Sequence, residues 1–110
     1  MITTDYKTDY AIVTIVAEKL DGTIAQDLKS EFIKVSARNV NNVIVNLFNN
    51  KYCDSSGLSA LLVGNRLCKN AGGKFFITAL QENVARLIQI SQLDTVLFIT
   101  STVEEAEAKI

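Results

Sequence analysis

The stretch YCDSSGLSALL, Tyr52–Leu62, decides how this sequence is interpreted, because a polar turn in it runs directly into an apolar periodic segment. Leu58, Leu61 and Leu62 recur at helical spacing, which predicts a helix that continues toward the paired glycines further on. Aspartate and serine are preferred at helix N-caps, so one of the polar residues is expected to cap this helix. A cap alone explains DSSG, and any further role for its hydroxyls depends on the rest of the chain.

Around this stretch, the apolar patterns alternate between strand and helix. Short β-branched or continuously apolar runs predict strands at Tyr10–Lys19, Asn41–Phe48, Lys74–Leu80 and Thr95–Ser101, with an edge strand before the first of them. Helices are predicted from Thr23 to about Ala37, after the DSSG turn, across Gln81–Leu93 and over Val103–Lys109.

Local signals predict where these helices begin and end. Thr23 and Gln26 fit a capping box at the start of the first helix, and Thr102 and Glu105 fit another at the last. Gly72 and its neighbour predict a left-handed end to the helix that follows DSSG.

Strands joined by helices predict a small α/β domain with a mostly parallel or mixed sheet of about four to five strands and about four helices. The 110 residues are expected to form a single domain, residues 1–110. A chain of this length buries roughly 65% of its unfolded surface, so it can sustain its own core.

The composition makes several kinds of function improbable. Histidine is absent, which excludes histidine-based triads and histidine metal ligands, and the five glycines match neither the dinucleotide-binding nor the P-loop pattern. We therefore expect no enzyme activity and no cofactor or metal. The net charge of -1 gives no indication of a nucleic-acid partner, and no apolar run is long enough for membrane insertion. The expected location is the cytoplasm.

Three other groups of residues are weaker candidates for a site. Cys53 next to Asp54 could be a reactive thiol, but nothing nearby except Lys51 would lower its pKa, so a structural role is favoured. The acidic segment Glu104–Glu107 is explained by a solvated helix face. The polar residues after the second buried strand could bind a nucleotide or a partner, although turn formation is the simpler account; they are Asn46, Asn49, Asn50 and Lys51.

The DSSG turn follows a buried strand, and ligands and partners of α/β sheets meet the loops at the carboxyl ends of the strands. Two consecutive hydroxyls, Ser55 and Ser56, cannot both cap one helix equally well, so one is expected to point outward. The amides and positive dipole of a helix N-terminus stabilise a phosphate, which would add roughly -1.5 to -2 charges. The turn can therefore serve as a cap and as a phosphorylation switch.

At this point the sequence resembles a known family. LDG at Leu20–Gly22, the buried VIVNL strand and YCDSSGLSALL resemble, at their spacing, the STAS domain, and most closely its stand-alone bacterial form, the anti-sigma factor antagonist. The resemblance covers about Tyr6 to Ala108. It implies a STAS-like fold and a bacterial phosphoprotein that acts in signal transduction and transcription regulation.

The resemblance also implies a mechanism. In that family, the serine after the aspartate is phosphorylated by a serine kinase that is also the anti-sigma factor. The unphosphorylated form binds this kinase and releases the sigma factor, and a serine phosphatase resets the switch. The implied phosphorylation site is Ser55, and the implied partner-binding residues are Asp21, Asp54, Ser55, Ser56, Gly57, Leu58 and Ser59.

Two alternatives remain open. The first is a non-switching STAS subunit of a stress-signalling or lipid-transport complex, in which DSSG only caps the helix. The second is a sensor of a small ligand or nucleotide that uses the same loops, although the chain lacks the glycines of a phosphate-binding loop.

Overall fold

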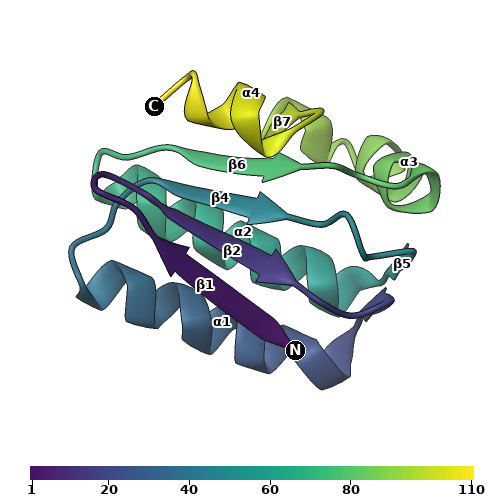
Figure 1. Ribbon diagram of the computed structural model, residues 1–110. Coiled ribbons are helices and arrows are strands. Elements are labelled where there is room, and N and C mark those ends of the chain that lie inside the picture. The colour runs from purple at the N-terminus through teal and green to yellow at the C-terminus, as the bar shows by residue number, and fades with distance from the viewer.

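The computed structural model covers residues 1–110 and is built around a five-stranded sheet with the strand order β1-β2-β4-β6-β7 (Figure 1). The strands are β1 (Ile2–Tyr6), β2 (Ala11–Ile15), β4 (Val43–Asn46), β6 (Phe75–Thr78) and β7 (Phe98–Thr100). β1 is antiparallel to β2, and the other three pairs are parallel. The expected mixed sheet, with an edge strand at the N-terminus, is confirmed.

Four α-helices cover this sheet, as the alternating pattern predicted. They are α1 (Gly22–Ala37), α2 (Ser55–Asn70), α3 (Glu82–Ile90) and α4 (Val103–Glu107). In Figure 1, α1 and α2 lie together on one face of the sheet and α4 lies on the other. β4 and β6 are therefore covered on both sides, which explains their continuous apolar runs.

Successive side chains of a strand point to opposite faces of the sheet, so the central strands contribute to two different apolar clusters. Val43 and Val45 of β4 belong to the larger cluster, which includes the buried faces of α1 and α2. Ile44 points the other way and packs with Phe76 and Ala106 beneath α4. The sheet thus has a substantial core on the α1–α2 side and a small one beneath α4.

A second, two-stranded sheet was not predicted. β3 (Lys19–Leu20) pairs in parallel with β5 (Tyr52–Cys53), so the predicted single strand Tyr10–Lys19 is wrong in its second half. The reason is a competing set of hydrogen bonds. The backbone N–H groups of Lys51 and Tyr52 both donate to the carbonyl oxygen of Glu18, at 2.8 and 3.1 Å, and draw this segment away from the main sheet.

Other predicted boundaries are corrected by local contacts. Thr23 is not the N-cap of α1, because the Asp21 carboxylate accepts hydrogen bonds from both the backbone N–H and the hydroxyl of Thr23. The last strand begins at Phe98, since Leu93–Thr95 forms a 3₁₀ turn. The predicted left-handed end is present at Gly72, with φ 78°, and the Thr102 side chain caps α4 as expected.

Candidate functional site

The DSSG turn forms the start of α2, and Asp54 is its N-cap. The Asp54 carboxylate accepts a hydrogen bond from the backbone N–H of Gly57 at 3.0 Å. The Asp54 carbonyl accepts another from the N–H of Leu58, also at 3.0 Å. The capping role therefore belongs to the aspartate, and neither Ser55 nor Ser56 is needed for it.

The LDG turn forms the start of α1 in the same way. The hydroxyl and the backbone N–H of Thr23 donate to the Asp21 carboxylate at 2.6 and 3.0 Å. These two hydrogen bonds, the hydroxyl first, lower the pKa of Asp21 below its usual 3.8. Both helices thus begin with an aspartate cap that is preceded by a short strand.

The pairing of β3 with β5 brings these two helix starts side by side. Leu20 pairs with Cys53, and the Asp54 N–H donates to the Leu20 carbonyl at 3.2 Å. A side-chain carbon at Gly57 would lie 2.2 Å from this same carbonyl oxygen, so only glycine fits there. A side-chain carbon added at Gly22 would lie 3.7 Å from the Ser56 hydroxyl oxygen. The LDG and DSSG turns therefore form one continuous surface.

The predicted partner-binding residues divide into two groups on this surface. Asp54, Ser55, Ser56 and Ser59 are exposed and Asp21 is half-buried. Gly57 and Leu58 are buried, so they shape the site from below and are not available for contact. The hydroxyl of Ser55 makes no hydrogen bond within the protein, and it lies one helical turn from Ser59 on the same side of α2.

Cys53 is a structural thiol beside the site. Partial burial, and then the neighbouring Asp54 carboxylate, raise the pKa of Cys53 to about 12. Its Sγ is close to the Asp54 carbonyl oxygen, at 3.4 Å. A thiol with this pKa is almost entirely protonated at neutral pH and therefore a poor nucleophile, as its sequence context predicted.

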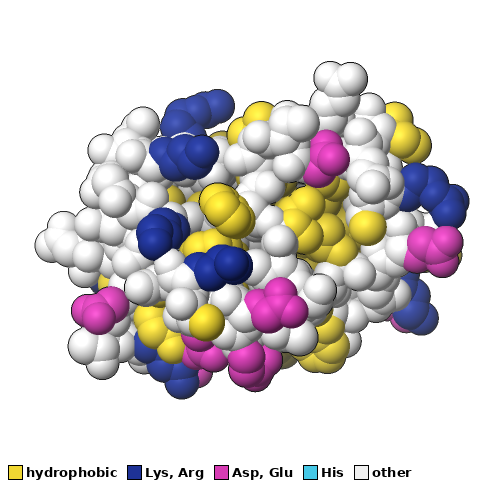
Figure 2. Space-filling model, turned by 90° about the horizontal axis from the view of Figure 1, so that it is seen from above, with side chains coloured by type: hydrophobic (Ala, Val, Ile, Leu, Met, Phe, Trp, Pro, Cys, Tyr) yellow, Lys and Arg dark blue, Asp and Glu magenta, His cyan; other side chains and the backbone are white.

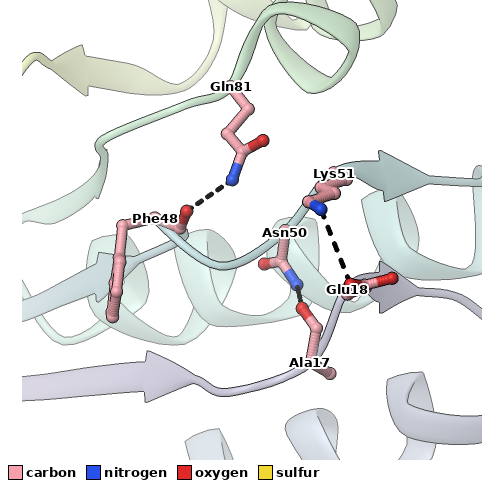
Figure 3. Close-up of polar contacts among 6 residues, drawn as sticks. All are labelled: Ala17, Glu18, Phe48, Asn50, Lys51 and Gln81. Atoms are coloured by element: carbon pink, nitrogen blue, oxygen red, sulfur yellow. Dashed lines mark hydrogen bonds and ion pairs between the residues drawn. The ribbon is translucent and has the colours of Figure 1, made fainter.

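The polar loop between β4 and β5 is a framework for the site (Figure 3). Asn50 is fully buried and its Nδ2 donates to the Ala17 carbonyl at 2.5 Å. The Lys51 ammonium lies 3.6 Å from the Glu18 carboxylate, and the side-chain amide of Gln81 donates to the Phe48 carbonyl at 2.6 Å. These contacts join the loops after β2, β4 and β6 at the carboxyl edge of the sheet. Asn50 therefore has a structural role, as a buried side chain that joins two loops, which the turn-forming interpretation did not predict.

The sequence did not reveal two aromatic residues near the site. Phe48 and Tyr52 are 50% and 53% exposed, and they lie two positions before and two positions after the buried Asn50 in the sequence. Phe48 is the last residue of the apolar run that predicts a buried strand, so nothing in the sequence indicated that its side chain is exposed. Beside this loop lies a shallow hollow of about 430 Å³ lined by residues that include Val16, Glu18 and Gln81.

The structure contains neither a cluster of metal ligands nor a membrane-spanning helix. No three residues among cysteine, aspartate and glutamate come close enough together to hold a metal ion. None of the helices combines the length and the apolar character that crossing a bilayer requires.

Comparison with solved structures places this arrangement among known folds. An anti-sigma factor antagonist from Mycobacterium paratuberculosis superposes with a TM-score of 0.88 at 18% identity, over 100% of this chain and 92% of that one. A proposed anti-sigma factor antagonist from Thermotoga maritima gives 0.87 at 22% identity, over 99% and 93%. The unphosphorylated form of the anti-sigma factor antagonist SpoIIAA, a Bacillus protein, gives 0.84 at 19% identity, over 99% and 95%. At these identities the likeness shows a shared fold.

The sequence profile of the STAS domain provides the family assignment. It matches residues 2–106, which is nearly the whole chain and includes both capped helix starts. The chain therefore belongs to the STAS domain family.

Proposed function

We propose that this protein is an anti-sigma factor antagonist whose binding to a serine-kinase anti-sigma factor is switched off by phosphorylation of Ser55. The observation that carries the proposal is the free hydroxyl of Ser55, which is exposed at the first position of α2 and is not used by the cap. Among the similar structures, SpoIIAA is described in an unphosphorylated and a phosphorylated form.

The surroundings of Ser55 support a phosphate at this position. The first N–H groups of a helix have no partner within it, and the Asp54 side chain takes only that of Gly57. The start of α1 lies beside that of α2, so the positive ends of two helix dipoles are close together. Ser56 is less suited, because its hydroxyl oxygen lies close to the turn at Gly22.

The same surroundings support a protein partner. Tyr52, in β5 directly before the Asp54 cap, is 53% exposed, and aromatic residues are enriched in the centres of protein interfaces. A phosphate would add roughly -1.5 to -2 charges to this surface, next to the carboxylates of Asp21 and Asp54. Desolvation of that charge, together with repulsion from an acidic partner group, is the proposed cause of release.

The proposal predicts that Ser55, and not its neighbour Ser56, is phosphorylated and controls binding to the kinase. Protein purified from its native cells should carry phosphate on Ser55, as mapped by mass spectrometry of intact protein and of its peptides. In binding assays with the copurifying kinase, Ser55→Ala should bind without being phosphorylated. Ser55→Asp should weaken the Kd by about tenfold or more, which corresponds to about 1.4 kcal/mol.

Ser56→Asp is the matched control, since it places the same charge one position away. If Ser55→Asp binds the kinase as tightly as the unmodified protein, the charge mechanism is wrong. If Ser55 carries no phosphate in any growth condition and the protein copurifies with a stable partner, a non-switching STAS subunit of a stress-signalling or lipid-transport complex replaces the proposal. A structural neighbour, RsbS from Moorella thermoacetica, is a variant with glutamate in place of a serine, which is a precedent for introducing an acidic residue at a serine.

A further inference from the structure

A groove of about 450 Å³ lies at the opposite edge of the sheet from β1 and opens beside β7. β7 pairs with β6 only from Phe98 onward, opposite Phe76, so Phe75 at the beginning of β6 is paired with β4 on one side and has no partner on the β7 side. Phe98 is 62% exposed and packs edge-on against Phe76, with ring centroids 5.4 Å apart. Val96 is 45% exposed and lines the same groove. The groove therefore has an accessible apolar wall.

Three lysines surround this wall, and no acidic residue lines the groove. Lys69 is in the last turn of α2, Lys74 directly precedes β6, and Lys109 follows α4. None of the three forms an ion pair. The Lys74 ammonium donates to the carbonyl oxygen of Lys109 at 2.7 Å, which holds it in place. The groove thus combines an apolar surface with uncompensated positive charge.

A buried amide provides a second and independent feature of the groove. Asn65 lies one helical turn before Lys69 on the same side of α2 and is only 7% exposed. Its Oδ1 is buried and accepts no hydrogen bond. Buried polar atoms are nearly always paired, so an unpaired one indicates a missing donor. Because the terminal torsion of asparagine is soft, this oxygen can turn toward a donor in the groove.

Seen from above, the molecule presents apolar side chains near the centre of this face, Lys and Arg side chains to their left, and Asp and Glu side chains beside them (Figure 2). Another hollow of about 500 Å³ is lined by polar loop residues and contains no buried unpaired atom. Ligand sites in proteins are mostly apolar, with a few placed polar groups, and the groove beside β7 has this composition.

We propose that this groove binds an amphipathic hydroxy acid, a small molecule with an apolar chain, one carboxylate and a hydroxyl close to it. The chain lies against Val96 and Phe98, the carboxylate is bound by Lys74 and Lys109, and the hydroxyl donates to Asn65. Charge-assisted hydrogen bonds to the lysines supply the polar part of the affinity. The proposal is independent of the switch at Ser55, which lies at the other end of α2.

The test uses the full chain, labelled with ¹⁵N, and 3-hydroxydecanoate as the probe. Titration followed by amide chemical shifts should give saturable changes at Lys69, Lys74 and Phe98. The double variant Lys74→Gln/Lys109→Gln should weaken the Kd by about fivefold or more, because it removes both charge-assisted contacts. Lys34→Gln is the control, since it removes one positive charge from the exposed surface of α1.

Ligands that lack one group at a time separate the contributions. Decanoate, without the hydroxyl, should bind more weakly than 3-hydroxydecanoate, and Asn65→Ala should abolish this difference. Decanol, without the acid, should bind more weakly still. The proposal is overturned if decanol binds as well as the acids, if the double lysine variant leaves the Kd unchanged, or if the shifts map outside the groove.

Discussion

At the scale of single residues, two aspartates determine where the helices of the site begin. Asp21 and Asp54 each accept a hydrogen bond from a backbone N–H within the first turn, at 3.0 Å in both cases. Because Asp54 performs the capping at α2, the hydroxyls after it are free for other contacts. The stability of this turn and the switching proposed for it therefore depend on different side chains.

The first prediction tests this division. Asp54→Ala removes the cap of α2, and we expect the free energy of unfolding to fall by about 1 kcal/mol, the usual cost of losing an N-cap. Ser55→Ala should change it much less, since Ser55 contributes no hydrogen bond. Urea denaturation followed by circular dichroism measures both. A loss of stability in Ser55→Ala as large as that in Asp54→Ala would show that the capping is assigned to the wrong residue.

Residue types alone identified DSSG as a helix start, but they could not select which of three polar side chains is the cap. The selection depends on backbone geometry. The same limit explains the incorrect cap at Thr23, where the capping-box pattern fits the sequence but Asp21, two positions earlier, has the extended backbone of an N-cap. The buried Asn50 was also hidden, because asparagine in a loop usually indicates a turn.

At the scale of elements, the close approach of α2 to β3 holds the site together. The two-residue strands β3 and β5 lie directly against the first turn of α2, where Gly57 leaves no room for a side chain. The alternating pattern predicted the main strands and the longer helices, because the central strands and α1 and α2 bury apolar faces, whereas α4 was predicted from its cap. It could not predict β3 and β5, since a pair of two-residue strands has no periodicity to recognise.

The second prediction concerns this contact. Gly57→Ala places a carbon 2.2 Å from the Leu20 carbonyl oxygen and 2.9 Å from the Cys53 sulfur, so the backbone must move. We expect a loss of about 1–3 kcal/mol, the range for overpacking. Gly22→Ala is the matched control, because its new carbon meets only the Ser56 hydroxyl at 3.7 Å. Thermal denaturation of both variants makes the comparison, and equal melting temperatures would contradict the packing argument.

At the scale of the whole molecule, the two thiols link folding to pH. Burial raises the pKa of Cys68 to about 11, and burial together with the Asp54 carboxylate raises that of Cys53 to about 12. An unfolded thiol ionises near pH 9, so above that pH the unfolded chain binds fewer protons than the folded one. Stability from this source is complete below about pH 9 and is lost as the pH rises through the folded pKa values.

The third prediction is an alkaline slope that depends on these cysteines. The free energy of unfolding should fall as the pH rises from about 9 toward the folded pKa values of about 11 and 12, and it should fall less steeply in Cys53→Ala and Cys68→Ala. The slope is compared, and not the absolute stability, because each substitution also removes packed atoms. Ser59→Ala, which removes no titrating group, should keep the original slope. Identical slopes in all four proteins would show that the thiols do not titrate differently on folding.

Because the pairing of β3 with β5 joins the two turns, the site forms only once the chain has folded. Asn50 and Ala17, whose contact fixes this pairing, are 33 positions apart, and joining them requires the chain between them to close into a loop. The surface around the proposed phosphate acceptor, which joins the LDG and DSSG turns, is therefore assembled by tertiary structure. A kinase that recognises the joined turns would pass over nascent and unfolded chains, so that only molecules competent to bind a partner would be marked.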